Sequence, residues 1–182
     1  MRKLLFVFIL ASSLPAYALR LGVHGGVNSS NFGSDANVNY NGKSGLLIGG
    51  IIESKMGAFF SLQLEADYVQ KGISGTNLNY FEIPALLRLN LPFPIITPFA
   101  MAGPSLGFLS SATNSSGADI KSNFSGTDFG LIVGGGVELA MGPVAALIVQ
   151  LRYQIGLTDV DKAAGTLKNN GFQVTGGLLF GF

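Results

Sequence analysis

The feature that most constrains the fold is a period of two in the apolar residues. In the segment FSLQLEADY, from Phe60 to Tyr68, every second residue is apolar and the residues between are polar. The last eleven residues, FQVTGGLLFGF, repeat the alternation, and their apolar row ends on Phe180 and Phe182. A period of two is typical of a β-strand whose faces lie in different surroundings. The sequence therefore predicts an all-β protein.

Eight such strands are predicted, and the connections between them are of two kinds. The predicted strands lie at 19–28, 44–53, 58–71, 77–91, 97–110, 127–140, 144–156 and 171–182. Long polar connections at 29–43, 111–126 and 157–170 alternate with short turns at 54–57, 92–96 and 141–143, and the segment 73–76 is a short exception at the long-loop end. Long loops at one end and short turns at the other are typical of transmembrane barrels. We expect an eight-stranded antiparallel up-and-down transmembrane β-barrel.

Composition indicates which face of the barrel meets lipid. Hydrophobic residues make up 48% of the chain and charged residues 12%, about half the charged share of an ordinary soluble domain. The apolar rows should therefore face lipid and the polar rows the interior, whereas a soluble lipocalin-like barrel has the reverse arrangement. Aromatic residues near the strand ends predict two interfacial girdles. One girdle contains Tyr68, Phe81, Phe129, Tyr153 and Phe172, and the other contains Phe60, Phe99, Phe180 and Phe182.

The first 18 residues, MRKLLFVFILASSLPAYA, have the parts of a secretory signal peptide: two basic residues, an apolar stretch and a small-x-small site that ends at Ala18. The apolar stretch is shorter than the ~20 residues of a spanning helix. We expect residues 1–18 to be removed and 19–182 to form the barrel. The full chain has 11 basic and 10 acidic residues, and Arg2 and Lys3 are removed with the signal peptide. The mature chain therefore has a formal net charge of −1. Such a charge disfavours nucleic acid as a partner.

Three local features complicate the strand pattern. Pro84 and Pro104 lie inside predicted strands, where a closed barrel offers no free edge, so each is expected to mark a bulge. The segment 44–53 is apolar on both faces, and its sequence leaves its register open.

The order of the motifs resembles one family. The segments LEADYVQKG (64–72), YFEIPALLRL (80–89), PFAMAGPSLGFL (98–109), DFGLIVGGGVEL (128–139), LRYQIGLTDV (151–160) and NGFQVTGGLLFGF (170–182) are similar to successive strands of the PorT-like outer-membrane β-barrel family, small porin-family proteins of the Gram-negative envelope. The resemblance implies an eight-stranded barrel in the outer membrane and a link to protein secretion. The short turns, which face the periplasm in such barrels, place both termini on the periplasmic side. The resemblance also implies that the barrel assembly machinery recognises the last strand through Phe180 and Phe182.

The charged residues of the strands are predicted to face inward. The alternation of inward and outward positions along the strands places six of them in the lumen: Glu65, Asp67, Glu82, Arg88, Glu138 and Arg152. Arg20 and Lys71 are expected at the rims of the lumen. Because side chains fill an eight-stranded barrel, these charges are interpreted as a structural network of pairs across the lumen. The alternative is a gated path for protons or ions, opened when a pair breaks.

Catalytic and metal sites are not predicted. His24 is the only histidine, and the sequence forces no nucleophile or acid beside it, so it is interpreted as a hydrogen-bonded lumen residue. The glycines 134–136 lack the lysine of a phosphate loop. Asp35, Asp119, Asp159 and Asp161 lack calcium-loop spacing, and the chain has no cysteine. We therefore expect no enzyme activity, no cofactor and no metal.

Three classes of function remain from the sequence. The leading hypothesis is a non-catalytic barrel in outer-membrane lipid, whose loops bind a partner or support a secretion or envelope complex. The alternative is a narrow gated channel for ions or small solutes, and the third class is a barrel enzyme. The ligand, the oligomeric state, conduction and the role of His24 remain open at the level of sequence.

Overall fold

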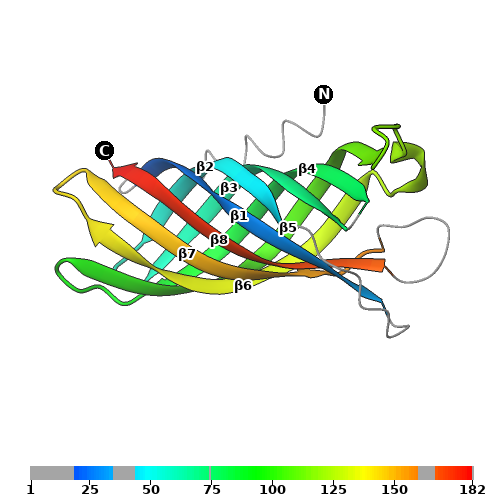
Figure 1. The fold of residues 1–182 in the computed structure, drawn as a ribbon. Coiled ribbons are helices and arrows are strands. Elements are labelled where there is room, and N and C mark those ends of the chain that lie inside the picture. The colour runs from blue at the N-terminus through cyan, green and yellow to red at the C-terminus, as the bar shows by residue number, and fades with distance from the viewer. Residues whose placement is uncertain (1–18, 35–43, 74, 160–166, 182) are drawn as a thin grey trace, which may run out of the picture.

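The computed structural model describes residues 19–34, 44–73, 75–159 and 167–181. The predicted signal peptide 1–18 and Phe182 lie outside the described residues. Eight antiparallel strands pair in sequence order and close into one barrel, as predicted (Figure 1). The strands are β1 (Leu19–Ser34), β2 (Ser44–Met56), β3 (Phe60–Ile73), β4 (Thr76–Asn90), β5 (Ile96–Asn114), β6 (Thr127–Ala140), β7 (Ala145–Gly156) and β8 (Leu167–Gly181). Within the described residues, no helix is long and apolar enough to cross a membrane.

Closure joins the first strand to the last. β1 and β8 pair from Arg20 opposite Gly181 to Ser34 opposite Leu167. Both strands extend further at the long-loop end than predicted. The prediction ended them too early because the Asn, Ser and Gly residues of these segments are typical of loops. Backbone hydrogen bonds hold a strand pair whatever its side chains, so a polar segment can extend the ladder.

The two faces of the barrel differ as the alternation predicts. Along β3 the side chains of Ser61, Gln63 and Glu65 are buried, whereas Phe60 and Tyr68 are 46% and 40% exposed. β2, whose register the sequence leaves open, places Leu47, Ile51 and Glu53 inside and Leu46, Ile48 and Ile52 outside. The outer wall is thus apolar and the interior contains the charges, the arrangement of a membrane barrel.

The predicted aromatic girdles are correct except for one described residue. Tyr68, Phe81, Phe129 and Phe172 are exposed near the long-loop end, where the Tyr153 ring contacts the Phe172 ring in a tilted arrangement with 4.7 Å between centroids. Phe60 and Phe180 are exposed near the short turns. Phe99 was predicted in the second girdle, and this is wrong.

Phe99 lies inside the barrel. It is 5% exposed, and its ring centroid lies 3.8 Å from the Arg88 guanidinium carbon. β5 is apolar on both faces, so its pattern could not assign Phe99 to either. Gly136 leaves room for the ring, because a Cβ atom there would come within 2.7 Å of it.

The prediction of bulges at the two prolines is also wrong. Opposite Pro84 the ladder between β3 and β4 is interrupted, but it resumes in the same register. Pro104 pairs with Leu131 without a shift. Among the described pairings of β4 with β5, the register shifts between Asn79 and Tyr80 instead. The missing N–H of a proline interrupts single hydrogen bonds without adding a residue to the strand.

Candidate functional site

Four charged residues form a cluster inside the barrel towards the short turns. Arg20 of β1 donates to both carboxylate oxygens of Glu138, at 2.5 and 2.7 Å, and to Oε2 of Glu53 at 2.7 Å. Arg88 of β4 donates to the same Glu53 oxygen at 3.0 Å and to Glu138 at 3.2 Å. Two guanidinium groups therefore share two carboxylates, and the cluster is electrically balanced.

A second cluster crosses the lumen from β7 to β3. Arg152 donates to Oε2 of Glu65 at 2.5 Å and to Oδ2 of Asp67 at 3.4 Å. The Nε2 atom of His24 lies 2.7 Å from Oδ1 of Asp67. Gln63 joins the two clusters, because its amide nitrogen donates to Glu65 at 2.5 Å and its oxygen accepts from Arg88 at 3.1 Å.

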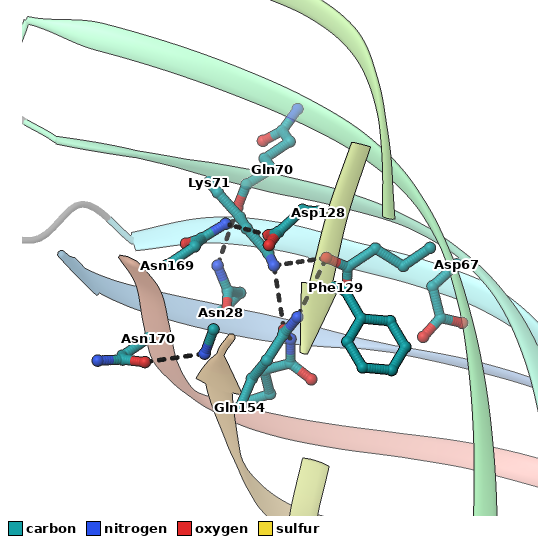
Figure 2. A network of polar contacts seen from close by, with 12 residues as sticks. Asn28, Asp67, Gln70, Lys71, Asp128, Phe129, Gln154, Asn169 and Asn170 are labelled. Carbon is teal, nitrogen blue, oxygen red and sulfur yellow. Dashed lines mark hydrogen bonds and ion pairs between the residues drawn. The ribbon is translucent and has the colours of Figure 1, made fainter. Parts of the chain in front are cut away.

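A third cluster lies nearer the long loops, where Lys71, Asp128, Gln154 and Asn169 point towards one another (Figure 2). The Lys71 ammonium donates to Glu82 at 2.5 Å and to Gln154 at 3.0 Å. Asp128 accepts from Asn169 at 3.2 Å and from the Thr158 hydroxyl at 3.1 Å. Amide and hydroxyl groups thus satisfy the carboxylate of Asp128, which has no ion pair within 4.0 Å among the described residues.

Buried apolar side chains form two further clusters in the interior. One cluster contains Ile51, Leu86, Phe99, Met101, Ile132, Ile148 and Leu179. A second contains Leu78, Tyr80, Leu109 and Ala112. Ile120 and Phe124, which flank the short helix η2 (Lys121–Asn123) in the connection from β5 to β6, pack against this second cluster. The connection therefore folds over the long-loop end of the interior.

The six lumen residues proposed from sequence are all buried within the barrel. The structure brings Arg152 to Glu65 and Asp67, and Arg88 to Glu138. Glu82 lies apart from both arginine clusters and pairs with Lys71. The rim residue Arg20 belongs to the first cluster.

Sequence reasoning missed two buried acids, Glu53 and Asp128. Glu53 is fully buried between Arg20 and Arg88, but it lies at the end of a segment without readable alternation. Asp128 shares its parity on β6 with Glu138, and both are buried. Counting in steps of two along β6 from the inward-facing Glu138 could therefore have identified Asp128 as another inward-facing residue.

The arrangement offers limited chemistry. Among the described residues, the only group suited to a metal ion is His24, Glu65 and Asp67, with ligand atoms within 4.8 Å of one another. The Arg152 guanidinium already bonds to both carboxylates there, so a cation would have to displace it. No described hydroxyl side chain is hydrogen-bonded to His24, which leaves the His24–Asp67 pair without an adjacent nucleophile.

Comparison with known proteins agrees with this architecture. Residues 11–162 match the family described as Outer membrane protein beta-barrel domain. No curated protein sequence matches the chain. Neisserial surface protein A has a similar solved structure, with a TM-score of 0.64 and 20% identity over 89% of this chain and 97% of that one.

Two further solved structures are similar in fold. OprG from Pseudomonas aeruginosa has a TM-score of 0.53 and 14% identity over 93% of this chain and 97% of its own. The Yersinia pestis attachment invasion locus protein Ail has a TM-score of 0.51 and 11% identity over 90% and 98%. At these identities the likeness shows the fold alone.

Proposed function

The chain belongs to the outer membrane protein β-barrel domain family, and we propose that it is a non-catalytic, non-conducting barrel that acts through its loops. The single observation that supports this most strongly is the pair of buried arginines that form ion pairs across the lumen. Arg88 and Arg152 are at most 1% exposed, and each is bonded to two carboxylates from other strands. Separating a buried ion pair costs about 3 to 5 kcal/mol, so an open lumen would be rare.

The proposed orientation in the membrane is based on the difference between the two ends of the barrel. Residues 1–18 are removed as a signal peptide, the short turns and both termini face the periplasm, and the long loops face the exterior. The barrel assembly machinery engages β8, and the loops or wall support a secretion or envelope complex, as the resemblance to PorT-like proteins implies. The polar composition of the long connections supports this assignment.

Conductance across planar bilayers tests the proposal. The refolded wild-type barrel is expected to give no steps above the lipid background, whereas the Arg88→Ala/Arg152→Ala double variant, with two large interior side chains truncated, is expected to leak. Heat-dependent gel mobility shows that both barrels are closed before measurement. Regular conductance steps from the wild type would contradict a non-conducting lumen.

Cross-linking in native membranes tests the proposal that the barrel supports a secretion or envelope complex. After mild detergent extraction of native membranes, cross-linked material is expected to contain another envelope protein held through the long loops. A barrel that is always recovered alone would contradict a role in a complex.

One observation favours a narrow channel as the second candidate. Several buried side-chain atoms of the described lumen have no protein partner, among them Nε2 of Gln150, Oε1 of Gln173 and Nε of Arg152. A buried polar atom without a partner costs about 1 to 3 kcal/mol, and water molecules relieve this cost. A continuous file of such waters would conduct protons, which proton-flux measurements in liposomes would detect.

A further inference from the structure

A polar cavity lies near the long-loop end of the barrel. Its volume is about 300 Å³, and it is lined by Ser44, Gly45, Gln70, Lys71, Asn77, Asn79 and Thr113. Gln70, Asn77, Asn79 and Thr113 alternate with buried residues of β3, β4 and β5, so this part of the lining belongs to the outer face of the wall. This volume is at the lower limit of the ~300–1,000 Å³ of small-ligand sites. We propose that this cavity binds a sugar of a glycolipid headgroup in the surrounding leaflet.

The cavity forms where two neighbouring strands separate. β2 and β3 pair as far as Leu47 opposite Val69, but β2 continues along β1 to Ser44 opposite Ser29. Side-chain amides replace the lost ladder: Asn28 donates to the Gln70 carbonyl at 3.1 Å from inside, and the Gln70 side chain accepts from the Leu46 N–H at 3.4 Å. Figure 2 shows the Gln70 side chain directed away from the interior cluster.

The bulge in the pairing of β4 with β5 supplies the rest of the lining. Tyr80 pairs with Leu109 but Asn79 pairs with Ser111, so Ser110 is an extra residue. The outward row of β5 therefore changes from even-numbered to odd-numbered residues, while Ala112 is buried inside. Ser111 and Thr113 then share a face with Asn79 and Asn77, and Asn79 donates to Ser111 at 2.8 Å. Bulges commonly redirect side chains in this way.

The height of the cavity is fixed by an aromatic row just below it. Tyr68 pairs with Phe81, and Phe81 pairs with Phe108, so three exposed aromatic rings lie side by side on β3, β4 and β5. Such a row marks the boundary between hydrocarbon and headgroups. The next outward row is Gln70, Asn79 and Ser111. The cavity therefore opens at the level of lipid headgroups, and it faces the outer leaflet if the long loops are exterior, as proposed above.

The lining favours a neutral polyhydroxyl ligand. Carboxamides and hydroxyls both donate and accept hydrogen bonds, which matches adjacent hydroxyl groups of a sugar. Lys71 is the only charged residue of the lining, and Glu82 and Gln154 hold its ammonium group inside the barrel. The lining contains no carboxylate to select a cation. The aromatic row below offers apolar surface for the ring face of the sugar.

Titration of the refolded barrel in micelles with purified short-core lipopolysaccharide tests the proposal. The side-chain amide NMR signals of Gln70, Asn77 and Asn79 are expected to shift with saturation, whereas those of Asn170, on the far wall in β8, are expected to stay in place. Asn79→Ala should weaken binding by about three- to tenfold, the effect of losing one neutral hydrogen bond. Asn170→Ala is the matched control and should bind as the wild type does.

Three results would overturn the inference. Equal shifts at Asn170, or shifts confined to the aromatic row, would show general detergent or lipid association. Equal affinity for the delipidated core oligosaccharide would show that the sugar need not belong to a glycolipid. The micelle titration does not depend on membrane orientation, which protease digestion of the long loops on intact cells measures separately. Failure of the proposed orientation is thus distinguishable from failure of the site.

Discussion

At the scale of single residues, Arg152 is held by two acids of one strand. It contacts Glu65 and Asp67 from across the lumen and is fully buried. Arg152→Ala should lower the free energy of unfolding of the refolded barrel by about 3 to 5 kcal/mol, because it leaves two buried carboxylates without their guanidinium partner. Urea titration in detergent measures the change, with exposed Lys55→Ala as the control. An unchanged midpoint would indicate hydrated charges and favour the channel.

Phe99 tests whether an aromatic residue belongs to the interior or to the lipid face. Its ring lies beside the Arg88 guanidinium, at 3.8 Å, and a desolvated cation–π contact contributes about 2 kcal/mol. Phe99→Leu should therefore destabilise the barrel by about 1 to 3 kcal/mol. Phe60→Leu, on the lipid-facing side, should change stability by about 0.5 kcal/mol or less. Equal losses in urea titration would return Phe99 to the outer girdle.

At the scale of elements, the three glycines at 134–136 allow β6 to approach its neighbours closely. A Cβ atom at Gly134 would come within 2.7 Å of the Arg152 backbone on β7. Gly134→Ala should lower the free energy of unfolding by about 1 to 3 kcal/mol, because the strands must separate. Gly176→Ala in β8 is the matched control, since its Cβ atom would meet only the Ile148 carbonyl, at 3.9 Å. Similar midpoints for both variants would show that β6 tolerates a side chain.

Side-chain amides bond to backbone groups at the places where two paired strands separate. Where β7 and β8 separate beyond Gln154 and Gly171, the Asn170 side chain accepts from the Gly156 N–H at 2.9 Å. Gln70 and Asn28 serve the same purpose between β2 and β3. Backbone groups left without a ladder partner need another one, and amides are suited to this because they donate and accept. The many Asn and Gln residues near the long loops are thus partly structural.

At the scale of the whole molecule, closure depends on the pairing of β8 with β1 from end to end. Deleting Phe182 should impair assembly more than stability. The interfacial position that the sequence predicts for this ring would bury only part of its surface, and full burial of a Phe contributes ~1.5 to 3 kcal/mol. The truncated chain should refold in detergent with heat-dependent gel mobility, yet accumulate poorly in outer membranes of cells. Normal membrane levels would contradict an assembly signal at Phe182, and Phe180→Ala provides a second test of the same strand.

The sequence by itself determined the class of fold and the sidedness of most strands. The alternation of apolar and polar residues in β3 and β7 predicted that Glu65, Asp67 and Arg152 face the lumen and not the lipid. This prediction was possible because successive side chains of a strand point to opposite faces of the sheet. Loop lengths determined the up-and-down order. The low share of charged residues then assigned the apolar rows to lipid, since a soluble barrel needs a charged outer surface.

Only the tertiary structure decided which charges meet and where the register changes. Glu53 and Phe99 lie on strands that are apolar on both faces, so alternation carried no information about them, and pairing with neighbouring strands set their direction. Closure of the barrel brings Arg20 of β1 and Glu138 of β6 together across the lumen, although they are 118 residues apart in the sequence. The bulge at Ser110 and the separation of β2 from β3 follow from backbone pairing between neighbouring strands. Such pairing depends on all eight strands together, and no single segment encodes it.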